Sequence, residues 1–108
     1  MINVIVYEDT NHDYVGFCSI GHAEMAEQGY DIVCASASIL MINSVNAIET
    51  FTNNTFTLVE NEEEGLLHFK LETSPSQETK TILKTMVLGI RTMCDSYEEY
   101  INLSIEEV

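Results

Sequence analysis

The spacing of apolar residues changes along this chain, and the order of those changes restricts the folds that it can adopt. Residues 2–7 are rich in β-branched side chains, with Ile2, Val4 and Val6 at alternate positions, and residues 14–20 have a similar composition. Alternation is typical of a strand with one buried face, and the short polar segment EDTNHD between the two runs is suited to a turn. We therefore expect the chain to begin with a β-hairpin.

From Asp31 the apolar spacing becomes three and four residues, which is the period of a helix that buries one face. Asp31 is a suitable N-cap, because its carboxylate can accept hydrogen bonds from the first N–H groups of a helix. We expect the helix to start there, to hold Cys34 in its first turn and to end near Phe51. The apolar stripe consists of Val33, Ala37, Leu40, Met41, Val45, Ile48 and Phe51.

The second half of the chain repeats this order. Residues 55–60 and 66–71 are strand-like, and the acidic segment NEEEG joins them as a hairpin turn. Ser74 is the expected N-cap of a second helix, with Pro75 in the first helical position and Gln77 completing a capping box. The stripe of this helix consists of Ile82, Leu83, Met86, Val87, Ile90, Met93, Cys94 and Tyr97.

Residues 100–106 alternate once more and predict a final strand, which gives the element order ββαββαβ. Hairpins pair neighbouring strands antiparallel, so we predict an α+β fold. It is a two-layer sandwich, a mainly antiparallel sheet with two long helices packed on one face. A chain of 108 residues supports one core, so we expect residues 1–108 to form a single domain whose other sheet face is open to a second subunit.

The charge of the chain restricts its partners. It has 18 acidic and 4 basic residues, for a net charge of −14. Proteins bind nucleic acid through Lys and Arg, which replace the counterions of the phosphates, so we expect no direct binding to nucleic acid. An acidic surface is suited to basic partners, or serves solubility alone.

The cysteines and the first residues indicate where the protein works. Three cysteines without a CxxC pair do not form a disulfide framework, and they favour a reducing compartment. The segment MINVIVYEDTNHD has no basic region typical of a secretory signal, and no uninterrupted apolar run is long enough to cross a membrane. We expect a cytoplasmic protein that does not associate with membranes.

The segment GHAEMAEQGYDIVCASAS, residues 21–38, contains the pair that best supports chemistry, His22 and Cys34. Cysteine is a nucleophile as its thiolate, and the start of a helix favours an anion because its N–H groups are unpaired. An imidazole that reaches the thiol can take its proton and return it to a leaving group. The alternative is structural: His22 is a hydrogen-bonded loop residue, and Cys34 packs against the sheet as a small apolar side chain.

Four more residues of this segment have open roles. Asp31 is either a helix cap or the residue that orients His22. Ser38 lies one turn after Cys34, where it either lines a substrate cleft or bonds to the carbonyl four residues earlier. Gly21 and Gly29 flank a stretch that must turn back on itself for His22 to approach Cys34.

We expect no metal and no cofactor. Cys18, His22 and Cys34 are each able to bind zinc, but structural zinc sites usually use close ligand pairs, and Cys18 belongs to an expected strand. The glutamates of NEEEG lie in a turn, and we expect them to form a solvated tip rather than a pair of catalytic acids. The sequence has no glycine-rich phosphate loop, GxSxG elbow or HExxH motif.

The residues of this segment resemble a known pattern, GHA…GxDIVCAxxSxL…VNAI. It is the pattern of the Prp family, also called YsxB-like, the ribosomal-processing cysteine proteases of Firmicutes and related bacteria. Glu24 and Met25 depart from it, since the family often has Asp and an aromatic or small residue there. The matching positions are Gly21, His22, Ala23, Gly29, Asp31, Ile32, Val33, Cys34, Ala35, Ser38, Leu40, Val45, Asn46, Ala47 and Ile48.

The resemblance implies a specific activity. Members of the family remove a short N-terminal extension from the large-subunit ribosomal protein numbered twenty-seven, and their catalytic pair corresponds to His22 and Cys34. The partner that the resemblance implies is therefore the N-terminal extension of this ribosomal protein, which we expect to be basic. It also implies a homodimer, and a loop between the pair that closes over substrate, which makes Gly21 and Gly29 candidate hinges. The alternative function is a non-catalytic ribosome-associated or assembly module that binds basic protein segments through its acidic surface. A weaker alternative is a redox-sensing thiol at Cys34.

Overall fold

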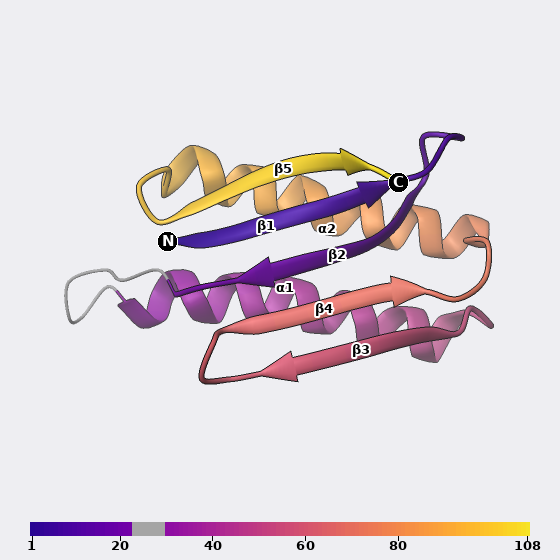
Figure 1. Cartoon of the computed structure of the whole chain (residues 1–108), viewed down its shortest axis with the longest axis horizontal. Helices are drawn as coiled ribbons and strands as arrows, with labels where there is room; N and C mark the ends of the chain where they lie inside the picture. The colour runs from indigo at the N-terminus through magenta and orange to yellow at the C-terminus, as the bar shows by residue number, and fades with distance from the viewer. Residues whose placement is uncertain (23–29) are drawn as a thin grey trace.

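The computed structural model describes residues 1–22 and 30–108 of the chain. Their elements follow one another in the predicted order ββαββαβ (Figure 1). Gly29, Glu24 and Met25, on which the sequence made predictions, lie outside the described residues. The elements are β1 (Ile2–Glu8), β2 (Tyr14–Ile20), α1 (Tyr30–Phe51), β3 (Phe56–Asn61), β4 (Leu66–Leu71), α2 (Gln77–Ser96) and β5 (Ile101–Glu107).

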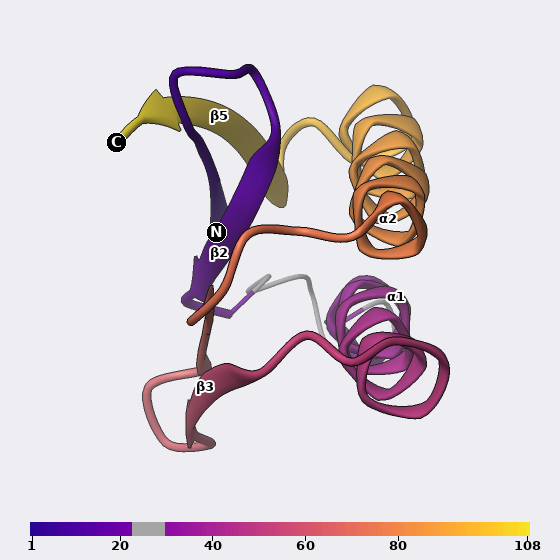
Figure 2. The same ribbon diagram turned by 90° about the vertical axis from the view of Figure 1, so that its right-hand side faces the viewer.

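The described strands form one mixed sheet in the order β3-β4-β2-β1-β5. β1 pairs antiparallel with β2, β2 with β4, and β3 with β4, whereas β1 and β5 are parallel. Both helices cover the same face of the sheet, as the end-on view in Figure 2 shows. The predicted α+β sandwich, with a mainly antiparallel sheet and two helices on one face, is therefore confirmed.

The core lies between the sheet and the two helices. Phe69 in β4 is fully buried at its centre, with its ring 5.2 Å from that of Phe17 and 5.0 Å from that of Phe56, centroid to centroid. The helices complete this core with Ile48 of α1 and Ile90 of α2, which are both fully buried. Burial of these large apolar side chains is the main source of stability for a fold of this kind.

The second helix starts later than the sequence predicted, so the assignment of Ser74 as its N-cap is wrong. Ser76 caps α2, and its hydroxyl accepts a hydrogen bond of 3.2 Å from the backbone N–H of Thr79. The reason is Asn54, whose side chain donates to the carbonyl of Ser74 at 2.8 Å and accepts from the N–H of Ser76 at 2.9 Å. These bonds hold the preceding segment outside the helix, beside the end of α1.

The first helix begins at Tyr30, before the predicted start at Asp31. Asp31 therefore lies within the first turn, and its side chain lies outside the described part of the structure, so its role in orienting His22 stays a prediction. Cys34 begins the second turn rather than belonging to the first. Side chains on a helix lean toward its N-terminus, so we expect the thiol to lean toward the first turn, whose N–H groups have no partner within the helix.

Among the described residues, the stretch Ile32–Phe51 of α1 is long and apolar enough to cross a membrane by length and composition alone. Its mean hydropathy is 1.5. Some of the side chains that raise this value are part of the core, because Val33, Met41 and Val45 are buried. Polar residues interrupt this stretch, so it is not an uninterrupted apolar run of the kind that the sequence lacks.

Candidate active site

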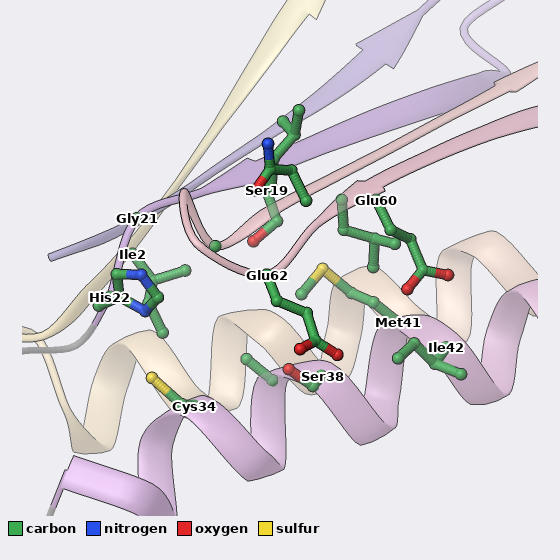
Figure 3. Close-up of a pocket in the computed structure, with 15 residues that line it drawn as sticks. Ile2, Ser19, Gly21, His22, Cys34, Ser38, Met41, Ile42, Glu60 and Glu62 are labelled. Atoms are coloured by element: carbon green, nitrogen blue, oxygen red, sulfur yellow. The ribbon is translucent and has the colours of Figure 1, made fainter.

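A pocket of about 360 Å³ lies at one end of the sheet, between the end of β2, the β3–β4 turn and α1. Four of the predicted site residues line it: Gly21, His22, Cys34 and Ser38. Figure 3 shows the imidazole of His22 and the sulfur of Cys34 at the same end of this pocket. The fold thus places an imidazole and a thiol, twelve positions apart in the sequence (34 − 22), in the lining of one pocket.

Gly21 determines where the chain leaves β2. Its φ angle is +104°, a backbone conformation that side chains disfavour, and a Cβ atom there would overlap the carbonyl oxygen of Met1. The backbone N–H of Gly21 donates to the carbonyl of Glu64 at 3.3 Å, which ties the end of β2 to the β3–β4 turn. Gly21 therefore directs the next residue, His22, into the pocket. Its role as a hinge stays a prediction.

The side chain of His22 is fixed by the same turn. Its Nε2 lies 3.1 Å from the main-chain oxygen of Glu63, at hydrogen-bonding distance. His22 is thus hydrogen-bonded, as the structural alternative expected. His22 also lines the pocket together with Cys34, so the same side chain is placed for chemistry.

Cys34 and Ser38 share one face of α1, because residues four apart in a helix lie above one another. Cys34 is half-buried: part of it packs against the core, and part of it lines the pocket. Ser38 is exposed and lines the pocket one turn further along the helix (Figure 3). The contact of Cys34 with the core agrees with the structural interpretation, and its place in the pocket lining agrees with the chemical one.

Two acidic residues that the sequence interpretation missed also line the pocket, Glu60 and Glu62 (Figure 3). The alternation of β3 could have identified Glu60, because Phe56 packs against the core and residues at even spacing share a face. Glu62 belongs to the turn that we expected to be a solvated tip. It is exposed, but the turn folds over the pocket, and no spacing rule predicts that approach.

The other two thiols have surroundings that suppress ionisation. Cys18 lies on β2 between the buried residues Phe17 and Ser19, so it faces away from the helices, and burial raises its pKa. Burial also raises the pKa of Cys94 on α2, and the carboxylate of Asp95 adds to that effect. Among the described side chains, no three His, Cys, Asp or Glu residues lie close enough together to hold a metal ion.

We expect a thiol alkylator such as iodoacetamide to modify Cys34 severalfold faster than Cys18 or Cys94 near neutral pH. The reason is that a raised pKa lowers the fraction of reactive thiolate at Cys18 and Cys94. The rates are measured by quenching at intervals and quantifying each cysteine-containing peptide by mass spectrometry. Equal rates for the three cysteines would show that Cys34 is not activated.

A thiol and an imidazole that line one pocket are the nucleophile and the base that cysteine hydrolases use, and they point to that class. Comparison with known proteins gives the particular family. Residues 1–102 match the sequence model of the family described as cysteine protease Prp. The chain belongs to this family of cysteine proteases, which confirms the resemblance found in its sequence.

Two curated relatives and two solved structures support the assignment. The ribosomal processing cysteine protease Prp of Staphylococcus aureus (strain NCTC 8325 / PS 47) is 36% identical over 84 residues, 78% of this chain and 79% of the relative. The protein of the same name from Bacillus subtilis (strain 168) is 23% identical over 96% of both chains. Crystal structures of the S. aureus protease with a covalently linked product peptide and with a substrate peptide match 98% of this chain and all of theirs. Their TM-scores are 0.90 and 0.89, at 31% and 30% identity.

Proposed function

We propose that this protease removes the N-terminal extension of the large-subunit ribosomal protein numbered twenty-seven, with Cys34 as nucleophile and His22 as base. The observation that carries the proposal is that both side chains line the same pocket. The names of the relatives, ribosomal processing cysteine proteases, support the class of substrate. We also propose a cytoplasmic location, which rests on the cysteine content and the first residues of the sequence, and a homodimer, which rests on the family resemblance.

The proposed reaction has two stages. His22 takes the proton of the Cys34 thiol, and the sulfur attacks the carbonyl carbon of the scissile peptide bond. The bond to nitrogen then breaks, His22 returns the proton to the leaving amine, and the extension remains on Cys34 as a thioester. Water, activated by His22, attacks the thioester and releases the extension as a carboxylate, which restores the thiol.

The start of α1 is suited to stabilise the charge that develops on the substrate oxygen. The first N–H groups of a helix have no intrahelical partner, and the thiol of Cys34 leans toward them from the second turn. Donors in this position can hold an oxyanion that forms on the carbon attacked by the sulfur. We propose that these N–H groups form the oxyanion hole.

The charge of the pocket is suited to a basic substrate. The carboxylates of Glu60 and Glu62 line the pocket beyond Cys34, on a protein whose net charge is −14. Opposite charge raises the rate of encounter and helps to select the orientation of a bound peptide. Ser38 and Gly21 line the same pocket, so we propose that they belong to the substrate cleft.

The activity is tested by mixing the full chain with a peptide that spans the extension and its junction, and by following the products by mass spectrometry. We expect cleavage at one bond, with kcat/KM falling as salt concentration rises. A matched peptide whose Lys and Arg residues are replaced by Gln should be cut more slowly and depend less on salt. Salt-sensitive binding with no cleaved product would contradict the proposal and favour the non-catalytic binding module.

A further inference from the structure

The β3–β4 turn, residues 62–65, makes a contact with His22 that the proposed reaction does not yet use. The main-chain oxygen of Glu63 lies 3.1 Å from Nε2 of the imidazole. The turn is held in place at its next residue, where the oxygen of Glu64 accepts the N–H of Gly21 at 3.3 Å. Two consecutive carbonyls of one turn therefore bind the two residues that directly follow β2.

The contact determines which nitrogen of His22 carries the proton. A carbonyl oxygen has no hydrogen and can only accept, so Nε2 must be the donor in this bond. A neutral imidazole has one N–H, and the other nitrogen, Nδ1, then holds the lone pair. The contact with the main-chain oxygen of Glu63 thus selects the Nε2–H tautomer of His22.

We propose that the main-chain carbonyl of Glu63 is a positioning group of the active site: it holds His22 as the Nε2–H tautomer and presents Nδ1 as the base for Cys34. This inference rests on the proposed function of the pair. It assigns to the backbone the orienting role that a carboxylate or amide side chain has in other catalytic triads. A carbonyl does not titrate, so it orients the ring before and after His22 takes the proton.

The same contact restricts the role of Asp31. Because Nε2 is bound to Glu63, a carboxylate that oriented His22 would have to bind Nδ1. Nδ1 is the nitrogen that the thiol needs, and a carboxylate there would compete with it. Orientation of His22 by Asp31 would therefore use Nδ1, and it stays a prediction because the side chain of Asp31 lies outside the described part of the structure.

Gly65 allows the turn to approach His22. Its φ angle is +63°, and a Cβ atom there would overlap the carbonyl oxygen of Gly21 and lie 3.1 Å from Cε1 of the imidazole. The turn is also closed from within, since the N–H of Gly65 donates to the oxygen of Glu62 at 3.2 Å. An added methyl group at Gly65 must therefore move the turn away from β2, and the carbonyl of Glu63 moves with it.

The test is a measurement of the His22 tautomer in the full chain by ¹⁵N NMR of the imidazole, at a pH where the ring is neutral. We expect the native chain to show Nε2–H, and Gly65→Ala to show a mixture of tautomers. With the peptide substrate, Gly65→Ala should lower kcat about 100-fold while KM changes little, because a displaced base affects the chemical step. The matched control in the same turn is Glu64→Gln, which should keep the native tautomer and native kcat.

A second variant avoids the added methyl group, in case Gly65→Ala fails to fold. An ester in place of the Glu63–Glu64 peptide bond weakens the Glu63 oxygen as an acceptor and adds no bulk. It also removes the N–H of Glu64, which donates to Oδ1 of Asn61 at 3.3 Å, so Asn61→Ala serves as the control for that loss. We expect the ester to shift the tautomer of His22 and Asn61→Ala to leave the tautomer unchanged.

Two results would overturn the inference: a native His22 in the Nδ1–H form, or an ester chain that keeps both the native tautomer and the native kcat. The tautomer is read without substrate, so this failure differs from that of the proposed function. A native chain that cuts the peptide with His22 as Nδ1–H refutes the positioning role alone. A native chain with Nε2–H that cuts no peptide refutes the catalytic function and, with it, the catalytic meaning of the contact.

Discussion

Replacing Cys34 by alanine is expected to lower kcat for cleavage of the extension peptide by about 10⁴-fold or more, the scale of loss when a protease nucleophile is removed. The sulfur forms the covalent bond to the substrate in the proposed reaction, and no other described cysteine lines this pocket. The change also leaves the fold intact, because Cys34 is only half-buried. The measurement is product formation under single-turnover conditions, followed by mass spectrometry.

Cys94→Ala is the matched control for this experiment. Cys94 is also a half-buried helical cysteine that packs against the core, but it lies on α2, away from the pocket. We expect it to keep native kcat. If Cys34→Ala cleaved the peptide as fast as the native chain, the assignment of Cys34 as nucleophile would be wrong.

The second large effect concerns stability. Phe69→Ala should lower the free energy of unfolding by about 3–5 kcal/mol, the usual cost of removing a buried aromatic ring. The ring is fully buried and contacts both Phe17 and Phe56, so neighbouring strands cannot fill the space without losing their own packing. Urea unfolding monitored by circular dichroism gives the free energy, provided that the slope with denaturant is unchanged.

Leu88→Ala provides the comparison, because Leu88 on α2 is 67% exposed. Its removal should change the free energy of unfolding by about 0.5 kcal/mol or less. A loss below about 1 kcal/mol for Phe69→Ala would mean that the centre of the core lies elsewhere.

Local patterns in the sequence were enough to predict the elements and their layers. The alternation of Ile2, Val4 and Val6 identified a strand with one buried face, and all three side chains are buried in the structure. The start of α2 could not be predicted in this way, because Asn54 decides it and lies far from Ser76 in the sequence. A helix cap that depends on a distant side chain leaves no local pattern.

The site shows the same limit more strongly. Spacing alone paired a thiol near a helix start with a histidine after a strand, but it left a structural alternative open for both residues, and only the family pattern favoured catalysis by His22 and Cys34. The contact between His22 and Glu63 joins residues 41 positions apart and uses a main-chain atom, so no side-chain motif could have predicted it. Tertiary structure alone determines which carbonyl meets an imidazole.

The position of Met1 has a practical consequence for work on this enzyme. Met1 touches the space that a side chain at Gly21 would occupy, and the neighbouring Ile2 lines the pocket itself. The other end of the chain, Val108, lies at the opposite end of the sheet (Figure 1). An affinity tag fused before Met1 would emerge beside the pocket and compete with peptides for it, so purification handles, fluorophores and surface tethers belong after Val108.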